Sequence, residues 1–343
     1  MYLLIISVTI VLFVTFLVLK AFEKKPARYG NRIIHTVPEN KNMVVGDSAD
    51  EVIRRERVFR IIKNIVSYTF LGFMALCMII PFYWMIATSL KTGAEIDLPT
   101  PTFIPGLGKF ELALSNYPQA IERLNAARLI YNTLVVGIVS TIGTVVTTVM
   151  AAFAFSRIKF VGRELIFTIF LATMMIPGEM MVITNYITVT KTAKTLFGVS
   201  GIDTYWAMIV PFLISVYYIY LLRQNFKQIP NELYYAAKVD GTSDFKYLIK
   251  VMVPIALPTI ITISILKLMG SWNAYVWPMM VTRDENMRLI TTGLRASFSD
   301  SEGRVAQGLQ MAATTVVTLP LLFVFIFLRK YIMRGVSRSG IKG

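Results

Sequence analysis

Long apolar runs separated by short polar stretches dominate the pattern of residues along this chain. A helix needs roughly 20 apolar residues to cross a bilayer core of about 30 Å, and backbone exposed to lipid must satisfy its own hydrogen bonds. Runs of this length therefore predict membrane-spanning helices and an all-helical fold. We expect seven spans, at residues 3–19, 65–90, 129–155, 165–186, 204–222, 253–277 and 311–328.

Composition supports the same class of protein. Of the 343 residues, 55% are hydrophobic and 16% are charged, and the mean hydropathy is +0.60. A soluble domain needs far less apolar sequence for its core, so the surplus has to face lipid. The net charge of +15 comes from basic residues that flank the apolar runs. Because they form no single stripe, we expect no nucleic-acid binding.

Cysteine and histidine give no basis for a reactive or metal-binding site. Cys77 is the only cysteine and lies in an apolar run, so neither an intrachain disulfide nor a thiolate metal cluster can form. His35 is the only histidine and lies in a polar stretch, where we interpret it as a solvated loop residue. We therefore expect no metal site and no catalytic residue in this chain.

The distribution of basic residues predicts the orientation in the membrane. Of the 35 Lys and Arg residues, 24 lie on one side, in residues 20–63, 157–163, 223–250 and the tail after 328. Cytoplasmic loops carry the excess of Lys and Arg, so this side is expected to be cytoplasmic. Seven spans with a cytoplasmic C-terminus put the N-terminus outside the cell.

The first apolar run lies apart from the rest. It has no basic residues before it, is too long for a signal sequence and is not followed by a small-residue cleavage site, so we interpret it as a retained anchor. Residues 24–60 mix Pro, Gly and charges of both signs without an apolar period, which is typical of a flexible linker. We expect two parts: residues 1–63 as anchor and cytoplasmic linker, and residues 64–343 as a six-helix core.

The longest cytoplasmic loop of the core, at 229–258, predicts a helix-turn-helix. Pro230 can open a short helix, and Glu232 favours the positive end of that helix. Gly241 can adopt the left-handed conformation that ends it, and the Thr242-Ser243 pair can cap a second helix. Such a unit would project from the membrane face and offer a binding surface to a partner protein.

The same loop resembles the coupling loop of binding-protein-dependent ABC importer permeases. That loop reads EAA, three residues, G, nine residues, I, any residue, L, P. Here Ala236 and Ala237 match the alanines and Gly241 matches the glycine, followed by Val251, Val253 and Pro254 in the last three places. Tyr235 stands where the family has glutamate, and Glu232, three residues earlier, is usual in the carbohydrate branch. The resemblance implies an ATPase-coupling site at Glu232, Tyr235, Ala236, Ala237, Asp240, Gly241 and Pro254.

Other stretches after about residue 65 resemble carbohydrate-type permeases, especially the smaller subunit of the maltose-system type. They are the end of the first core helix, the start of the second, the basic turn that follows it, the outer end of the fifth, and the C-terminal ending. The residues that carry this resemblance are Phe82, Trp84, Ser89, Leu90, Lys91, Glu95, Asn132–Leu134, Ser156, Arg157, Phe160, Gly162, Arg163, Trp272, Asn273, Pro278 and 335–343.

The resemblance implies an all-helical membrane permease that works in an assembly in the cell membrane. Its partners would be a second permease chain, two cytoplasmic ATPase subunits and an extracytoplasmic binding protein. The chain has no G-x-x-x-x-G-K-[ST] phosphate loop, so ATP would be used by the partner ATPase and no cofactor bound here. The implied cargo is a sugar or a polyol, including a polyol phosphate. Closure of the ATPases would pull on residues 231–241 and switch the spans between inward and outward openings.

A few residues in the spans are candidates for a translocation path or outer gate: Glu179, Lys267, Trp272, Asn273 and Tyr275. A charge in a span is costly unless it faces protein or water, but Glu179 could also end a helix and a lysine can reach the interface along its own stem. The aromatic and amide side chains suit sugar contact, yet with Trp277 they also fit an interfacial aromatic belt. Both interpretations stay open. Pro177, Pro211 and Pro258 are expected to kink helices.

Two other classes of function compete with the permease. An ion-gradient-driven secondary transporter would need paired acidic residues deep in the spans or broken helices in both halves, and Glu179 is the one candidate acid. The second alternative is a purely structural membrane protein, but that class would leave the spacing of the coupling-loop motif unexplained.

Overall fold

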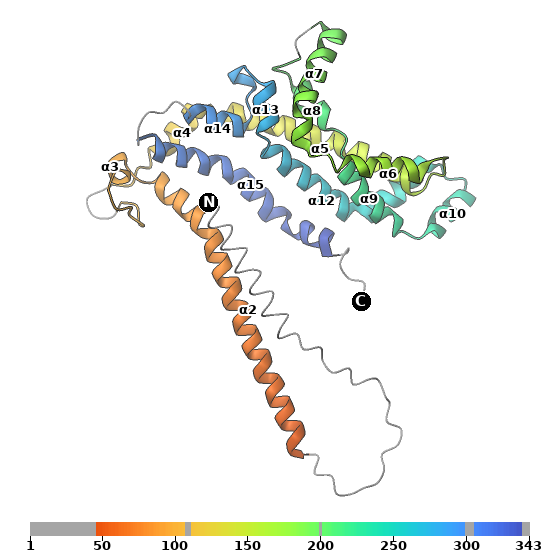
Figure 1. The fold of residues 1–343 in the computed structure, drawn as a ribbon, viewed down its shortest axis with the longest axis horizontal. Helices are drawn as coiled ribbons and strands as arrows, with labels where there is room; N and C mark the ends of the chain where they lie inside the picture. Colours follow the sequence, from red (N-terminus) through yellow and green to blue (C-terminus); the bar gives the residue numbers. More distant parts are fainter. Residues whose placement is uncertain (1–45, 107–110, 199–200, 299–304, 338–343) are drawn as a thin grey trace. The chain divides into compact units, whose positions relative to one another are not determined.

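The computed structural model describes residues 46–106, 111–198, 201–298 and 305–337. Every regular element in those residues is a helix (Figure 1), which confirms the all-helical prediction for them. The chain divides into two compact units, residues 1–73 and 74–343. The predicted anchor at 3–19 lies outside the described residues.

Helix α2 (Gly46–Ser89) is the first described element, and its residues 46–73 are the described part of the first unit. It begins within the stretch that the sequence predicted as a flexible linker up to residue 60, so that prediction is wrong for residues 46–60. The reason is local: the stretch from Ala49 to Arg57 is rich in Ala, Glu and Arg, which have high helix propensity.

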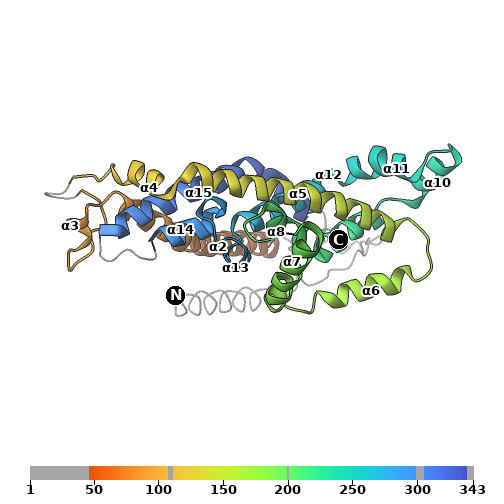
Figure 2. The same cartoon turned by 90° about the horizontal axis from the view of Figure 1, so that it is seen from above.

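In the second unit, α5 (Ala126–Ser156) lies along both α9 (Val216–Lys227) and α12 (Val253–Trp272), as Figures 1 and 2 show. Helix α15 (Val305–Ser337) packs on α12 and on the short α4 (Asn116–Leu124). One apolar cluster fills the space where the end of α5 meets α9 and α12, and another joins the start of α5 to α4 and α15. Two further short helices of this unit are α3 (Gly93–Ile96) and α14 (Ile290–Phe298).

Four described helices are long and apolar enough to cross a membrane: Val58–Ser89, Ala126–Ser156, Asp244–Trp272 and Gln307–Phe327. Two bent pairs bring the number to six if each pair is one span. Each of the six core spans predicted from the sequence falls on one of these helices or pairs.

The first bent pair contains α6 (Arg163–Thr173), the 3-10 helix η1 (Gly178–Met181) and α7 (Val182–Phe197). Its two arms meet at 89°, so the predicted single span at 165–186 is broken. Pro177 lies at the break in an extended conformation. A residue before proline is disfavoured in the helical conformation, and this ends the first arm as the sequence predicted for a kink.

The second bent pair joins α8 (Tyr205–Ile209) and the 3-10 helix η2 (Val210–Phe212) to α9, at 45°. Pro211 lies inside η2, again at the predicted kink. The Ser215 hydroxyl accepts a hydrogen bond from the Tyr218 amide at 3.4 Å and so caps the start of α9.

The predicted fifth core span has different ends in the structure. It begins earlier, because α11 (Asp244–Tyr247), a π-helical turn η3 (Leu248–Met252) and α12 form one continuous helix. It also ends earlier, at Trp272, and Trp277 belongs to the separate helix α13 (Val276–Val281). Helix α12 continues through Pro258, so the structure records no break there.

Candidate functional site

Helix α10 (Asn231–Val239) is the first half of the predicted helix-turn-helix. Figure 2 shows it with α11 at the end of the second unit where α5 and α9 end and α12 begins. Pro230 stands before the first turn and Glu232 lies within it, beside the positive end of the helix dipole. The helical part of the prediction is therefore confirmed.

The turn after α10 follows the predicted chemistry. Gly241 has a φ of 69°, in the left-handed region, and its amide donates to the Lys238 carbonyl at 3.1 Å. The Thr242 amide donates to the Ala237 carbonyl at 2.9 Å, which completes a Schellman motif. Of Thr242 and Ser243, the two predicted caps of the second helix, Ser243 has this role: its hydroxyl accepts a hydrogen bond from the Lys246 amide at 3.4 Å.

Side chains on the inner face of α10 brace it against α11. The Tyr234 hydroxyl donates to the Asp244 carboxylate at 2.8 Å, and the Lys238 ammonium lies 2.8 Å from the same carboxylate. The ring centroids of Tyr234 and Tyr247 are 5.2 Å apart, edge to face. The hydrogen bond to Asp244 raises the pKa of Lys238, and burial together with the Asp244 hydrogen bond raises that of Tyr234. These contacts hold the two helices together.

The outer face of α10 is open and carries apolar side chains. On this face Val239 is 88% exposed and Tyr235 is 54% exposed; Leu233, at the flank of the helix, is 44% exposed. A soluble loop normally has little reason to expose such side chains together, and they suit a protein partner. Glu232, Ala236, Asp240 and Gly241 are exposed on the same helix and its turn.

Two residues of the predicted coupling site lie elsewhere. Ala237 is half-buried and packs against the apolar cluster between α5, α9 and α12. Pro254 is exposed in the first turn of α12, beyond the π-helical turn. The small side chain of Ala237 therefore lets α10 approach its own bundle, whereas that of Ala236 is available to a partner.

A cavity of about 600 Å³ lies between the two bent pairs and the C-terminal end of α12. Glu179, Lys267 and Tyr275 line it, together with polar groups from α5 and aromatic residues from α9. Glu179 lies on η1 at the break between α6 and α7 and is exposed. The structure thus brings together three of the five residues considered for a path or gate.

Trp272 and Asn273 do not line this cavity. Trp272 is buried in the apolar cluster that joins α4, α5 and α15. The Asn273 side chain is exposed and donates to the Met269 carbonyl one turn back, at 3.1 Å. Both residues lie at the end of α12 and point away from the cavity. Trp277, on α13, lines the cavity instead, and its indole N–H donates to the Ala207 carbonyl at 3.1 Å.

Several residues that hold these elements in place carried no assigned role in the sequence analysis. Arg157 was noted only within a basic turn, and Tyr234, Asp244 and Arg223 were not singled out. Arg223 directly follows the predicted span 204–222, where a basic residue is ordinary, so no local signal set it apart. The partners lie 59 or more residues away in sequence, so the pairing itself could not be predicted.

Comparison with known proteins gives a consistent result. The model of a family described as "Binding-protein-dependent transport system inner membrane component" matches residues 143–338. The sn-glycerol-3-phosphate transport system permease protein UgpE of Rhizobium meliloti (strain 1021) is 26% identical, over 82% of this chain and 98% of its own length. The lactose transport system permease protein LacG of Rhizobium radiobacter is 28% identical, over 82% and 97%. The arabinooligosaccharides transport system permease protein AraQ of Bacillus subtilis (strain 168) is 29% identical, over 62% and 73%.

Solved structures share the fold. A chain of a bacterial ABC transporter involved in the import of the acidic polysaccharide alginate superposes with a TM-score of 0.67 at 22% identity. It covers 81% of this chain and 98% of its own. A second structure, of a bacterial alginate ABC transporter in complex with alginate pentasaccharide-bound periplasmic protein, gives 0.57 at 14% identity, over 80% and 98%.

Proposed function

Because this chain belongs to the family of binding-protein-dependent transport system inner membrane components, we propose that α10 is the contact through which an ATPase drives it. The chain is a multi-pass membrane protein and the permease subunit of a binding-protein-dependent ABC importer. The ion-gradient alternative is disfavoured by the same relatives. The family is one of transport components, and the proposed role needs no catalytic residue in this chain.

The observation that carries the proposal is the exposed apolar face of α10. Tyr235 and Val239 stand on the outer face, while the Tyr234–Asp244 and Lys238–Asp244 contacts brace the helix from behind. A helix held to a second helix passes a push on to it, so these contacts link movement of α10 to α11. In the proposed contact, the exposed apolar side chains enter a groove of the ATPase, and Glu232 and Asp240 contact its rim.

The proposed cargo is a sugar or a polyol, including a polyol phosphate. The relatives named for glycerol phosphate, lactose and arabinooligosaccharides support this class. A cavity of about 600 Å³ is within the size of small-molecule sites, and its wall combines aromatic rings with a few polar groups, as ligand sites do. We assign cargo contact to Tyr275, Lys267 and Glu179, which line this cavity.

The proposed assembly and topology follow the family. A substrate-binding protein and an ATPase work with this permease; we propose two ATPase subunits and a second permease chain beside it. The proposed core has six spans, two of them broken, with the C-terminus in the cytoplasm. The first span at 3–19 is proposed as an additional anchor, which puts the N-terminus outside the cell.

Purification from the native membrane in mild detergent tests the docking proposal. The wild-type chain is expected to bring an ATPase with it, and Val239→Glu is expected to lose the ATPase because it puts a charge on the apolar face, at the C-terminal end of α10. Val161→Glu is the matched control, since Val161 is fully exposed in the turn between α5 and α6. An ATPase retained by Val239→Glu at the wild-type level would contradict the proposal.

A further inference from the structure

Two buried arginines join the ends of α5 and α9, and each donates hydrogen bonds to the end of the other helix. Arg157, directly after α5, donates from Nη2 to the Phe226 carbonyl at 2.9 Å and to the Ile229 carbonyl at 2.5 Å, at the end of α9. Arg223, within α9, donates from Nε to the Phe155 carbonyl at 3.0 Å, at the end of α5. Their residues are 7% and 3% exposed.

This arrangement is energetically specific. The last carbonyls of a helix have no partner within the helix and form the negative end of its dipole, so a cation there is favourable. Each arginine supplies that cation to the other helix and not to its own. The Phe226 carbonyl also accepts from the Ile229 amide, at 3.2 Å. Because the site is buried, removing Arg157 takes the arginine donor from the Ile229 carbonyl and removing Arg223 takes it from the Phe155 carbonyl, and sliding the helices past each other has the same effect.

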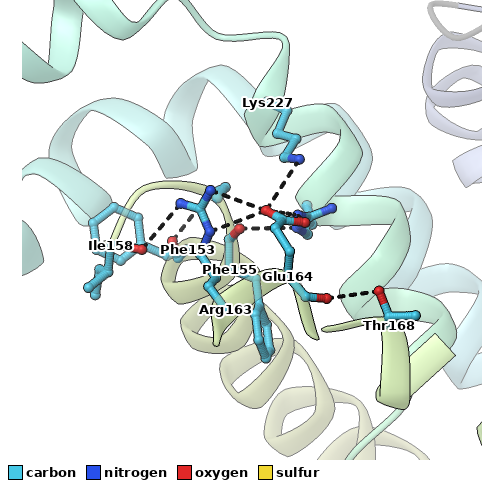
Figure 3. A network of polar contacts seen from close by, with 9 residues as sticks. Phe153, Phe155, Ile158, Arg163, Glu164, Thr168 and Lys227 are labelled. Carbon is cyan, nitrogen blue, oxygen red and sulfur yellow. Dashed lines mark hydrogen bonds and ion pairs between the residues drawn. The ribbon is translucent and has the colours of Figure 1, made fainter. Parts of the chain in front are cut away.

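The same guanidinium groups reach the elements on either side. Arg157 Nη1 donates to the Asn231 side chain, at the first residue of α10. Arg223 Nη2 contacts both oxygens of the Glu164 carboxylate, at 2.8 and 2.7 Å, and its guanidinium lies 3.8 Å from the centre of the Phe167 ring. Figure 3 shows the Glu164 carboxylate, which also faces Arg163 and Lys227. The ends of α5 and α9 and the starts of α6 and α10 are thus tied together.

Both helices joined in this way also reach the cavity. Val136 and Ser140, in the first half of α5, line it, as do Tyr217 and Tyr218 in the first turn of α9. The other connection from α10 runs through the π-helical turn η3 into α12. A π-helical turn is an irregular point of a helix, whereas the arginine contacts are directional and buried.

We propose that Arg157 and Arg223 are positioning residues that transmit movement of α10 to α5 and α9, and through them to the cavity. The inference rests on the proposed docking of the ATPase on α10. Movement of α10 breaks the part-buried, charge-assisted hydrogen bond between Arg157 and Asn231 unless the ends of α5 and α9 move with it. The two arginines therefore make α5, α9 and α10 move together.

The test uses the complete complex, purified through this chain and placed in lipid vesicles. In Arg157→Lys a buried cation remains, but a single ammonium cannot reach all three acceptors in the fork geometry of a guanidinium. We expect the variant to retain its ATPase and to hydrolyse ATP at the basal rate. Stimulation of hydrolysis by cargo-loaded binding protein is expected to fall about fivefold or more, within the range of coupling between sites.

The reciprocal variant and a control sharpen the result. Arg223→Lys is expected to behave like Arg157→Lys, and the double variant to be no worse than either single variant, because residues that act as a unit are not additive. Arg163→Lys is the control: Arg163 touches Glu164 and the Ile158 carbonyl but joins neither α5 to α9 nor α9 to α10. It is expected to keep normal stimulation.

Three results would overturn the inference. Normal stimulation in Arg157→Lys shows that the contact does not transmit movement. Loss of the ATPase from that variant assigns Arg157 to assembly instead. If the loss of stimulation in the double variant equals the sum of the two single losses, the arginines act as two separate contacts and not as one unit. A wild-type complex without any ATPase contradicts the proposed docking itself, which is a distinguishable outcome.

Discussion

The Lys267 ammonium donates a hydrogen bond to the Phe212 carbonyl, 3.0 Å away, where the span formed by α8 and α9 is broken. The same carbonyl accepts from the Thr144 hydroxyl at 3.2 Å, and the next carbonyl, of Leu213, accepts from Thr147 at 2.7 Å. A break within a membrane exposes backbone carbonyls that lipid cannot satisfy. Neighbouring helices satisfy them here, so Lys267 has a structural role as well as a place on the cavity wall.

This shared acceptor predicts non-additive stability effects. Lys267→Met and Thr144→Val each leave the Phe212 carbonyl with one donor, and each is expected to lower the free energy of unfolding by about 1 kcal/mol. The double variant leaves it with none of these donors and is expected to lose more than the sum. Thermal unfolding in detergent measures this, with the exposed Lys191→Met as control; strict additivity would contradict the shared role.

Gly293 is predicted to tolerate no side chain. A Cβ at this position would lie 2.4 Å from Leu129 Cδ1 and 2.6 Å from Cδ2, and Leu129 is buried between α4, α5 and α15. Gly293→Ala is expected to cost about 1–3 kcal/mol of stability by overpacking. Gly270→Ala, where nothing lies within 4 Å of the added atom, is the control.

The Gly293 prediction has a suppressor. Leu129→Ala removes the atoms that the new methyl group would meet. The double variant is therefore expected to lose less stability than the sum of the losses in Leu129→Ala and Gly293→Ala. The measurement is again thermal unfolding, and a wild-type unfolding midpoint in Gly293→Ala alone would refute the close approach of α14 to α5.

Gly241 is predicted to matter through its backbone. Its surroundings are empty within 4 Å, but its φ of 69° costs a residue with a branched side chain about 1–2 kcal/mol. Gly241→Val is expected to weaken retention of the ATPase, while Gly241→Asn, which tolerates this conformation, is expected to keep it. Equal retention in both variants would mean that the turn after α10 does not set the docking geometry.

Uptake kinetics distinguish the cavity wall from the end of α12. Tyr275→Ala removes an aromatic face from the cavity and is expected to raise the apparent KM of cargo uptake about tenfold, which corresponds to ~1.4 kcal/mol of lost contact. Asn273→Ala changes an exposed residue outside the cavity and is expected to leave KM unchanged. A larger effect in Asn273→Ala than in Tyr275→Ala would reverse the assignment of cargo contact.

Local features of the coupling loop were predictable from the sequence because local chemistry decides them. Pro230, Glu232 and Gly241 fixed the start, polarity and end of α10 without reference to the rest of the chain. Hydropathy located the four long apolar helices and the two bent pairs for a similar reason, since the bilayer sets the length of a span. The linker prediction failed at residues 46–60 because mixed charge is compatible with both linker and helix.

Features that depend on distant partners were not predictable. The predicted spans at 165–186 and 204–222 carried proline signals, but hydropathy does not tell a kinked helix from one bent by 89°. Trp272 and Trp277 are alike in sequence, yet one is buried in a cluster and the other lines the cavity, because α12 ends between them. The hydrogen bonds of Arg157 to the end of α9 and of Arg223 to the end of α5 could be predicted only if it were known which helix ends are neighbours.

Cross-linking tests the central claim, that the outer face of α10 contacts the ATPase, most directly. Cys77 is the only cysteine in the chain, so Cys77→Ser gives a background in which Val239→Cys, or Val161→Cys as control, is the single thiol. With a short thiol-to-amine cross-linker in native membranes, Val239→Cys is expected to give a product of this chain with the ATPase, in higher yield than Val161→Cys. No such product from Val239→Cys, with one from Val161→Cys, would contradict the claim and assign the contact to the turn between α5 and α6.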